Sequence, residues 1–176
     1  MVTLLVSSSA VIHRAGVRWE APPFQWCKLN VDGACDPVTG RASCGGAIRA
    51  DLGQWLIGFS RQLGMCSSLE AELWGIFEGL LCAWSIRITS LILESDCKEA
   101  LQMIDRARHS TRRSSIVEHI LRLLHRDWVV LLEFVPREGN VVANYMAKRA
   151  CGDGLIYHRF VLPPDGIRSL LQSDGG

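Results

Sequence analysis

The chain has 176 residues, of which 48% are hydrophobic and 21% are charged, and its formal net charge is +1. This composition is typical of one globular domain and excludes a disordered or repetitive chain. The nearly neutral charge excludes attraction to nucleic acid by net charge alone, so any such binding must depend on local basic patches.

The seven cysteines include no Cys-x-x-Cys pair, which argues against a zinc-thiolate or redox motif. The first residues, MVTLLVSSSAVIHRAG, have no basic leader followed by a long apolar segment, which argues against a signal peptide. No stretch approaches the roughly 18 apolar residues of a membrane span. We therefore expect free thiols, no membrane partner and a reducing intracellular compartment, either nucleus or cytoplasm.

The chain opens with an extended lead-in, because Pro22 and Pro23 disfavour helix. Three short β-rich runs follow, WCKLNVDGA, CGGAIRAD and QWLIGFSR, and they predict an antiparallel meander. Apolar residues then recur three and four apart from Ser67 to Trp84, which predicts an amphipathic helix. Its first residues resemble a capping box formed by Ser67 and Glu70.

The second half alternates between the two types of element. The run ITSLILES (88–95) predicts a buried strand, and a second helix begins at about Asp96. A third helix, a fifth strand and a last helix are predicted at 114–127, 128–137 and 140–150. This order, βββαβα(α)βα, favours one mixed sheet with helices on its faces.

We place the lead-in at 1–25, one domain at 26–152 and a C-terminal tail at 153–176. The tail contains LPPDGIRSLLQSDGG, which predicts a loosely attached turn of helix behind a proline break.

Two aspartates lie where predicted strands end. Asp32 ends the first strand, and Asp96 lies between the fourth strand and the next helix. Ligands collect beyond the strand ends of open α/β sheets, so neighbouring strands would bring these carboxylates together, and a divalent cation would offset their repulsion. Each also has a structural explanation, since Asp32 precedes a glycine and could be a turn residue, and Asp96 could be a helix N-cap.

A third acid could come from the first helix, which offers Glu70, Glu72 and Glu78. Glu78 projects away from the apolar stripe, and we expect it to be solvated. Glu70 and Glu72 flank the stripe on opposite edges, and a strip of small residues beside Glu72 would let another element approach closely. This modestly favours Glu72, but the periodicity alone does not decide between the two.

Four motifs in order, KLNVDGA, AELWGI, LESDCKEAL and VPREGNVVANYMAKRA, resemble the ribonuclease H type 1 domain. The closest resemblance is to the plant form, which occurs at the end of non-LTR retrotransposon polyproteins and as free-standing genes. The similarity covers roughly residues 18–174. It implies an α/β, ribonuclease H-like fold, with a five-stranded mixed sheet in the order 3-2-1-4-5 flanked by helices.

The resemblance also implies an activity and its residues. The family hydrolyses the RNA strand of RNA/DNA hybrids with two Mg²⁺ ions, for which Mn²⁺ can substitute, held by four acids. Matched position by position, Asp32, Glu72 and Asp96 are the first three catalytic and metal-binding residues, and the match selects Glu72 over Glu70. The fourth position is Asn144, in VAN, where the family has the aspartate of VAD.

Asn144 divides two hypotheses about function. An amide oxygen can bind a hard cation but brings no negative charge, so we expect a weakened or metal-demanding endonuclease. The rival is an inactive, nucleic-acid-binding remnant of a retroelement that keeps the fold. A third hypothesis, a structural α/β domain whose acids are only turns and caps, predicts that divalent metals do not raise the melting temperature.

Contacts with the nucleic acid are less visible in the sequence. The segment RARHSTRR carries Arg106, Arg108, Arg112 and Arg113, which could contact phosphates or could simply form a solvated linker. Hybrids are recognised by backbone shape and 2′-hydroxyl groups, so no base-reading motif is expected. The expected partner is an RNA/DNA hybrid or another nucleic acid, bound by a monomer.

Overall fold

A computed structural model describes residues 18–150 and 156–174 of the chain. They form one six-stranded sheet in the order β5-β4-β1-β2-β3-β6. Strand β1 is antiparallel to β2 and parallel to β4, β2 and β3 are antiparallel, and β4 and β5 are parallel. The strand bounds are β1 Cys27–Cys35, β2 Arg41–Arg49, β3 Trp55–Met65, β4 Ser90–Ser95, β5 Val129–Phe134 and β6 Tyr157–Phe160.

The first five strands confirm the predicted mixed sheet and its 3-2-1-4-5 order. The sixth strand was not predicted. β6 lies in the segment that we expected to be a tail and pairs antiparallel with β3, where Gly58 faces Phe160 and Arg61 faces Tyr157. Trp55 also donates a hydrogen bond from Nε1 to the Phe160 carbonyl, at 3.0 Å. Backbone pairing and the Trp55 side chain therefore hold β6 on the sheet.

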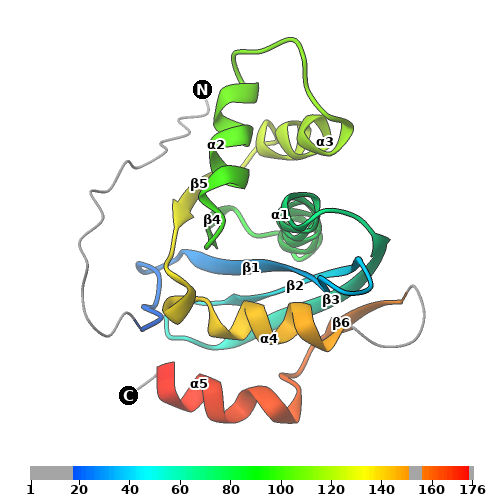
Figure 1. The fold of residues 1–176 in the computed structure, drawn as a ribbon. Coiled ribbons are helices and arrows are strands. Elements are labelled where there is room, and N and C mark those ends of the chain that lie inside the picture. The colour runs from blue at the N-terminus through cyan, green and yellow to red at the C-terminus, as the bar shows by residue number, and fades with distance from the viewer. Residues whose placement is uncertain (1–17, 151–155, 175–176) are drawn as a thin grey trace.

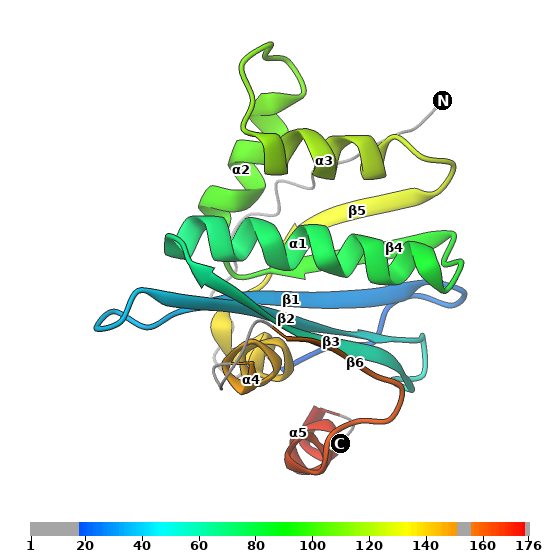
Figure 2. The ribbon, with the colours of Figure 1, turned by 90° about the vertical axis from the view of Figure 1, so that its right-hand side faces the viewer.

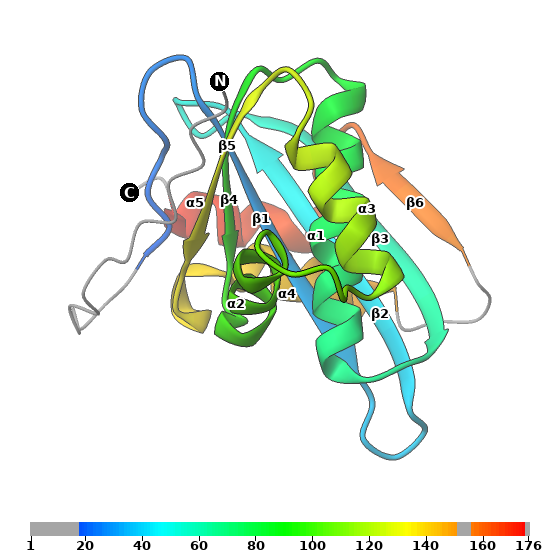
Figure 3. The same ribbon diagram turned by 90° about the horizontal axis from the view of Figure 1, so that it is seen from above.

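Helices cover both faces of the sheet (Figures 1 and 2). On one face α1 packs on the central strands, with α2 and α3 beyond it, while α4 lies on the opposite face with α5 outside it. The view from above shows α1 crossing the sheet near β1, β2 and β3 (Figure 3). Their bounds are α1 Ser68–Ser85, α2 Lys98–Ala107, α3 Ser115–Leu124, α4 Val141–Arg149 and α5 Arg168–Asp174.

Glycines allow α1 to lie directly on β1. A Cβ atom at Gly79 would be 2.8 Å from Leu29 Cδ2 and Val31 Cγ1, and one at Gly33 would be 2.5 Å from the backbone of Ala71. The predicted strip of small residues on α1 is thus the surface that approaches β1. This close packing places the first turns of α1 over the end of β1.

The segments outside the predicted domain also contribute to the core. Trp19 in the lead-in is 6% exposed and Ile167 near the C-terminus is 0% exposed. The boundaries at 25/26 and 152/153 stay predictions. Among the helices in the described ranges, none is both long enough and apolar enough to cross a bilayer.

Candidate metal centre

The parallel pairing of β1 with β4 brings two aspartates to one rim of the sheet. Val31 is in register with Ser95, so Asp32 and Asp96 follow at neighbouring positions. Asp32 lies inside β1, which continues to Cys35, so it does not end the strand as we predicted and it is not a turn residue. The N-cap of α2 is Cys97, so Asp96 is not the helix cap.

The start of α1 contributes a third carboxylate, and it comes from Glu72. Carboxylate oxygens of Asp32, Glu72 and Asp96 all lie within 4.8 Å of one another. Glu70 instead completes the predicted capping box, in which its carboxylate accepts from the Ser67 amide at 2.9 Å and its own amide donates to Ser67 Oγ at 3.2 Å. Since the cap occupies Glu70, Glu72 is the helix acid at this rim.

Glu78 differs from its prediction. It is 5% exposed rather than solvated, and it pairs with Arg61, which extends from β3. The apolar pattern of a helix predicts which of its own faces is buried. It does not predict that β3, a separate element, covers Glu78.

Burial and mutual repulsion hold protons on the three-carboxylate cluster in the absence of a cation. Burial, followed by the negative charge of Asp96, raises the pKa of Asp32 to about 6. Burial, followed by the charges of Asp32 and Asp96, raises the pKa of Glu72 to about 9. A site that raises the pKa of two acids in this way disfavours their charged forms, which a bound cation would stabilise.

Two oxygens of the cluster are buried without a hydrogen-bond partner, Glu72 Oε2 and Asp96 Oδ1. Asp96 has one cationic neighbour, because Arg137 Nε lies 3.4 Å from its Oδ2, but the Arg137 side chain is 90% exposed. Buried carboxylate oxygens are rarely left unsatisfied. Carboxylates are the ligands that Mg²⁺ and Mn²⁺ prefer, so these residues fit a divalent cation.

Asn144 on α4 faces the cluster, but through the nitrogen of its amide. Asn144 Nδ2 donates a hydrogen bond to Asp32 Oδ2 at 2.8 Å, and this bond lowers the pKa of Asp32 against the larger effect of burial. In this orientation the amide is a partner of Asp32. The amide oxygen would have to rotate toward the cluster before Asn144 could bind a cation.

Asn140, one helical turn before Asn144, is a further residue of the site that was not predicted from the sequence. Asn140 Nδ2 donates to the Val31 carbonyl at 2.9 Å, and Asn140 Oδ1 accepts from Asn30 Nδ2 at 3.3 Å. Asn30 and Asn140 are each 1% exposed. Together with the bond between Asn144 and Asp32, these contacts fasten α4 to β1. The sequence feature that could have indicated a buried polar partner is Asn30, a polar residue in an apolar strand, two positions before Asp32.

The four predicted arginines lie away from the cluster. Arg106 is at the end of α2 and the others follow it, whereas Asp96 precedes the first residue of this helix. Ten helical residues span about 15 Å, and Figure 1 shows the loop after α2 at the end of the helix remote from β4. Arg113 is bound to Glu118 at 3.1 Å, and Arg108 lies 3.8 Å from Asp105. Arg106 and Arg112 are exposed.

Residues 30–150 match the protein family described as "Reverse transcriptase-like". The chain is also 36% identical over 162 residues to an Arabidopsis thaliana protein named "Putative ribonuclease H protein At1g65750". That alignment covers 90% of this chain and 26% of the relative, so the chain spans about a quarter of the relative's length.

Solved structures share the fold. The N-terminal ribonuclease H domain of Rv2228c from Mycobacterium tuberculosis is similar with a TM-score of 0.65 and 21% identity, covering 72% of this chain and 99% of that one. Ribonuclease H1 from Halobacterium salinarum has a TM-score of 0.63 and 19% identity, with 73% and 99% covered. LC11-RNase H1, solved with an RNA/DNA hybrid, has a TM-score of 0.59 and 16% identity, with 70% and 95% covered.

Proposed function

Because this chain belongs to the reverse transcriptase-like family and carries a plant ribonuclease H-like domain, we propose that it hydrolyses the RNA strand of RNA/DNA hybrids. The observation that supports this most is the cluster of Asp32, Glu72 and Asp96, with two buried carboxylate oxygens that have no partner. The hybrid bound to the structural relative LC11-RNase H1 supports the choice of substrate. We propose a monomer as the active form.

The proposed cofactor is a pair of Mg²⁺ ions, with Mn²⁺ as a substitute, held by Asp32, Glu72 and Asp96. When bound, such a pair supplies an activated water and stabilises the leaving oxygen. The raised pKa values of Asp32 and Glu72 mean that both residues release protons as the cations bind. Arg137, exposed beside Asp96, is available to a substrate phosphate.

Asn144 limits this activity in the proposal. Where a fourth carboxylate would add charge to the site, the amide of Asn144 is neutral and donates to Asp32. A neutral fourth residue weakens cation binding more than it weakens contacts with the nucleic-acid backbone, because those contacts do not involve it. The chain is therefore a metal-demanding nuclease.

The second candidate function is an inactive domain that binds nucleic acid, and one observation favours it. The bond between Asn144 and Asp32 already gives Asp32 a partner in the absence of a cation. In this candidate the cluster is a remnant, and the surface around it still contacts the hybrid.

The deciding experiment is cleavage of a labelled RNA/DNA hybrid across Mg²⁺ and Mn²⁺ concentrations, with the native chain, Asp32→Asn and Asn144→Asp. We expect the native chain to cut, Asp32→Asn to lose cutting, and Asn144→Asp to cut faster and at lower metal concentration. A native chain that is silent at every concentration, while Asn144→Asp cuts, supports the inactive domain instead.

Two glutamates of one helical turn provide a matched control. Glu72→Gln removes a cluster acid, and we expect a loss of about 10²-fold or more in rate, as for other charged groups that stabilise a transition state. Glu70→Gln changes only the capping box, worth about 1 kcal/mol of stability, and we expect the rate to stay near the native value. Equal rates for the two variants would contradict the assignment of Glu72.

A further inference from the structure

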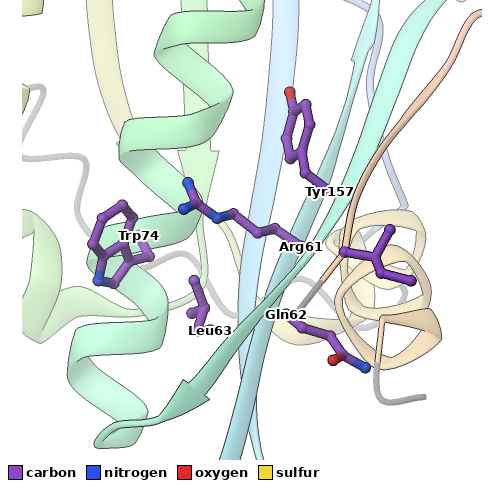
Figure 4. A pocket seen from close by; sticks show the side chains of 6 residues that line it. Arg61, Gln62, Leu63, Trp74 and Tyr157 are labelled. Atoms are coloured by element: carbon purple, nitrogen blue, oxygen red, sulfur yellow. The ribbon is translucent and has the colours of Figure 1, made fainter. Parts of the chain in front are cut away.

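A cavity lies on the α1 side of the sheet, between α1, β3 and β6. Its volume is about 330 Å³, which is at the small end of ligand pockets. Figure 4 shows Arg61 at its centre, extending from β3 toward Trp74 on α1, with Tyr157 of β6 on the other side. The remaining lining residues are Gln62, Leu63 and Ile156.

The polar group of this cavity is held in place by neighbours. The Arg61 guanidinium pairs with the buried carboxylate of Glu78 and lies 5.0 Å from the centre of the Trp74 ring. The Arg61 side chain is still 36% exposed. Because Glu78 offsets its charge, Arg61 offers hydrogen-bond donors and a flat surface more than an uncompensated positive charge.

The cavity lies in the row of the sheet next to that of Asp32, whose side chain points to the opposite face. Gly33, the residue after Asp32, pairs with Cys44, Cys44 pairs with Arg61, and Arg61 pairs with Tyr157. Neighbouring strands are about 4.8 Å apart, so Arg61 lies about 10 Å from Gly33 and Tyr157 about 14 Å. This separation corresponds to roughly three to four nucleotides of a duplex at 3.4 Å each.

We propose that this cavity binds an unpaired nucleobase of a single-stranded tail that continues from the hybrid, a site that rests on and extends the proposed function. Trp74 and Tyr157 offer aromatic faces for stacking, and stacking is independent of base identity. Gln62 and the donors of Arg61 line the same space. The offset charge of Arg61 favours a neutral base over a phosphate.

The other end of α1 provides an internal comparison. Trp84 is half-buried like Trp74 and has a guanidinium, that of Arg126, 4.9 Å from its ring centre. Trp84 also lines a cavity, of about 470 Å³, with Arg87 and Asp127. That cavity lies about 15 Å along α1 from Trp74, ten residues at 1.5 Å each, and so at the end remote from Glu72. Trp84 has the same kind of neighbours as Trp74 but lies remote from the carboxylate cluster, so it is the matched control.

The test measures binding in EDTA, so that no strand is cut, of a blunt hybrid and of the same hybrid with a short single-stranded tail. A stacked base contributes roughly five- to hundredfold in affinity, so we expect the tail to strengthen native binding by a factor in this range. Trp74→Ala should remove the gain, Trp74→Phe should retain most of it, and Trp84→Ala should leave it unchanged. A gain that survives Trp74→Ala, or that Trp84→Ala removes equally, overturns the proposal.

Binding of the single-stranded oligonucleotide alone separates this proposal from the proposed function. A native chain that binds the oligonucleotide through Trp74 but binds no hybrid retains the cavity site and refutes the proposed function. A native chain that binds and cuts blunt and tailed hybrids equally well, and does not bind the oligonucleotide, retains the function and overturns the cavity site.

Discussion

Two buried polar clusters lie side by side on β1, and they differ in how well their groups are satisfied. Around Asn30, the amide accepts from Trp19 Nε1 at 2.9 Å and donates to Glu94 at 2.7 Å, and Glu94 pairs with Lys28 at 2.7 Å. Around Asp32, two residues further on, three carboxylates meet and two oxygens have no partner. The first cluster pairs its carboxylate with a cation, whereas the second brings three carboxylates together.

Along this one strand, the first cluster contributes to stability and the second is suited to function. A buried polar group costs free energy unless it is hydrogen-bonded, and a buried charge costs more unless it is paired. In the Asn30 cluster the Asn30 amide is hydrogen-bonded and the Glu94 carboxylate is paired with Lys28. The cluster connects the lead-in, β1, β4 and, through Asn140, the start of α4. The Asp32 cluster does not meet these conditions, so it lowers the unfolding free energy of the metal-free chain. A bound cation would restore that stability.

The largest effect is expected in the satisfied cluster. Lys28→Met removes the partner of Glu94, which is 8% exposed, and breaking a buried pair in this way costs about 3–5 kcal/mol of unfolding free energy. Urea denaturation measures this loss. Adding Glu94→Gln to Lys28→Met should restore part of the stability, because the uncompensated charge is gone. A Lys28→Met chain as stable as the native one would show that the pair does not act as a buried pair.

In the carboxylate cluster we expect the opposite sign. The pKa of Asp32 is raised from an ordinary value near 4 to about 6, so the folded metal-free chain loses stability as the pH rises through this range. Asp32→Asn removes that loss and should stabilise the metal-free chain by about 1–3 kcal/mol at pH 8, with little effect at pH 4. Urea denaturation in EDTA at both pH values measures the difference.

Asp36 provides the control for Asp32→Asn. It lies in the turn between β1 and β2, where backbone amides of Val38 and Thr39 donate to it and lower its pKa. Asp36→Asn should therefore not stabilise the chain. Stabilisation by both substitutions would indicate a general charge effect instead of a strained site.

The effect of Mg²⁺ on stability should increase with pH. The folded pKa of Glu72 is about 9, so at pH 6 the cation must displace a proton from nearly every molecule, whereas at pH 9 about half of the molecules have already lost it. A ligand at ten times its Kd adds about 1.4 kcal/mol, so the rise in Tm at fixed Mg²⁺ should be larger at pH 9 than at pH 6. Glu72→Gln should remove most of this pH dependence, and an equal rise at both pH values in the native chain contradicts it.

The elements of the fold were largely predictable because periodicity and local signals determine them. The Ser67 and Glu70 capping box and the α1 stripe are local patterns, and the structure has them. The five-strand order is not local, and its prediction depended on the resemblance to the ribonuclease H family. Long-range partners were not predictable. Arg61 reaches Glu78 from a strand that precedes α1 in the chain, and β6 pairs with β3 from about a hundred residues away, so neither contact has a signature in its own segment.

The site was predictable in part for the same reason. Asp32 and Asp96 could be placed at strand ends, but their meeting depended on whether β1 and β4 were neighbours, and periodicity left Glu70 and Glu72 open. Asn30 and Asn140 were missed because a buried amide is identified by the partners around it. The direction of the Asn144 amide is likewise a property of the assembled site.

The smallest effect is expected from the basic loop after α2, which lies remote from the cluster. Arg112 is exposed, and screening at physiological salt extends over about 8 Å, less than the roughly 15 Å length of α2. We therefore expect Arg112→Ala to weaken hybrid binding only about twofold and, if it contacts a phosphate, to reduce the salt slope by about one. Binding measured across salt concentrations in EDTA tests both values.

Arg113 and Arg122 show whether that small effect is specific to the loop. Arg113 is bound to Glu118 and to the Ser110 carbonyl, so Arg113→Ala should change affinity less than Arg112→Ala. Arg122, on α3, is 72% exposed and also contacts Glu118, and its removal should leave the salt slope unchanged. If neither Arg112→Ala nor Arg122→Ala changes the slope, the loop is a solvated linker. If both lower it equally, the effect is general to exposed arginines and is not specific to the loop.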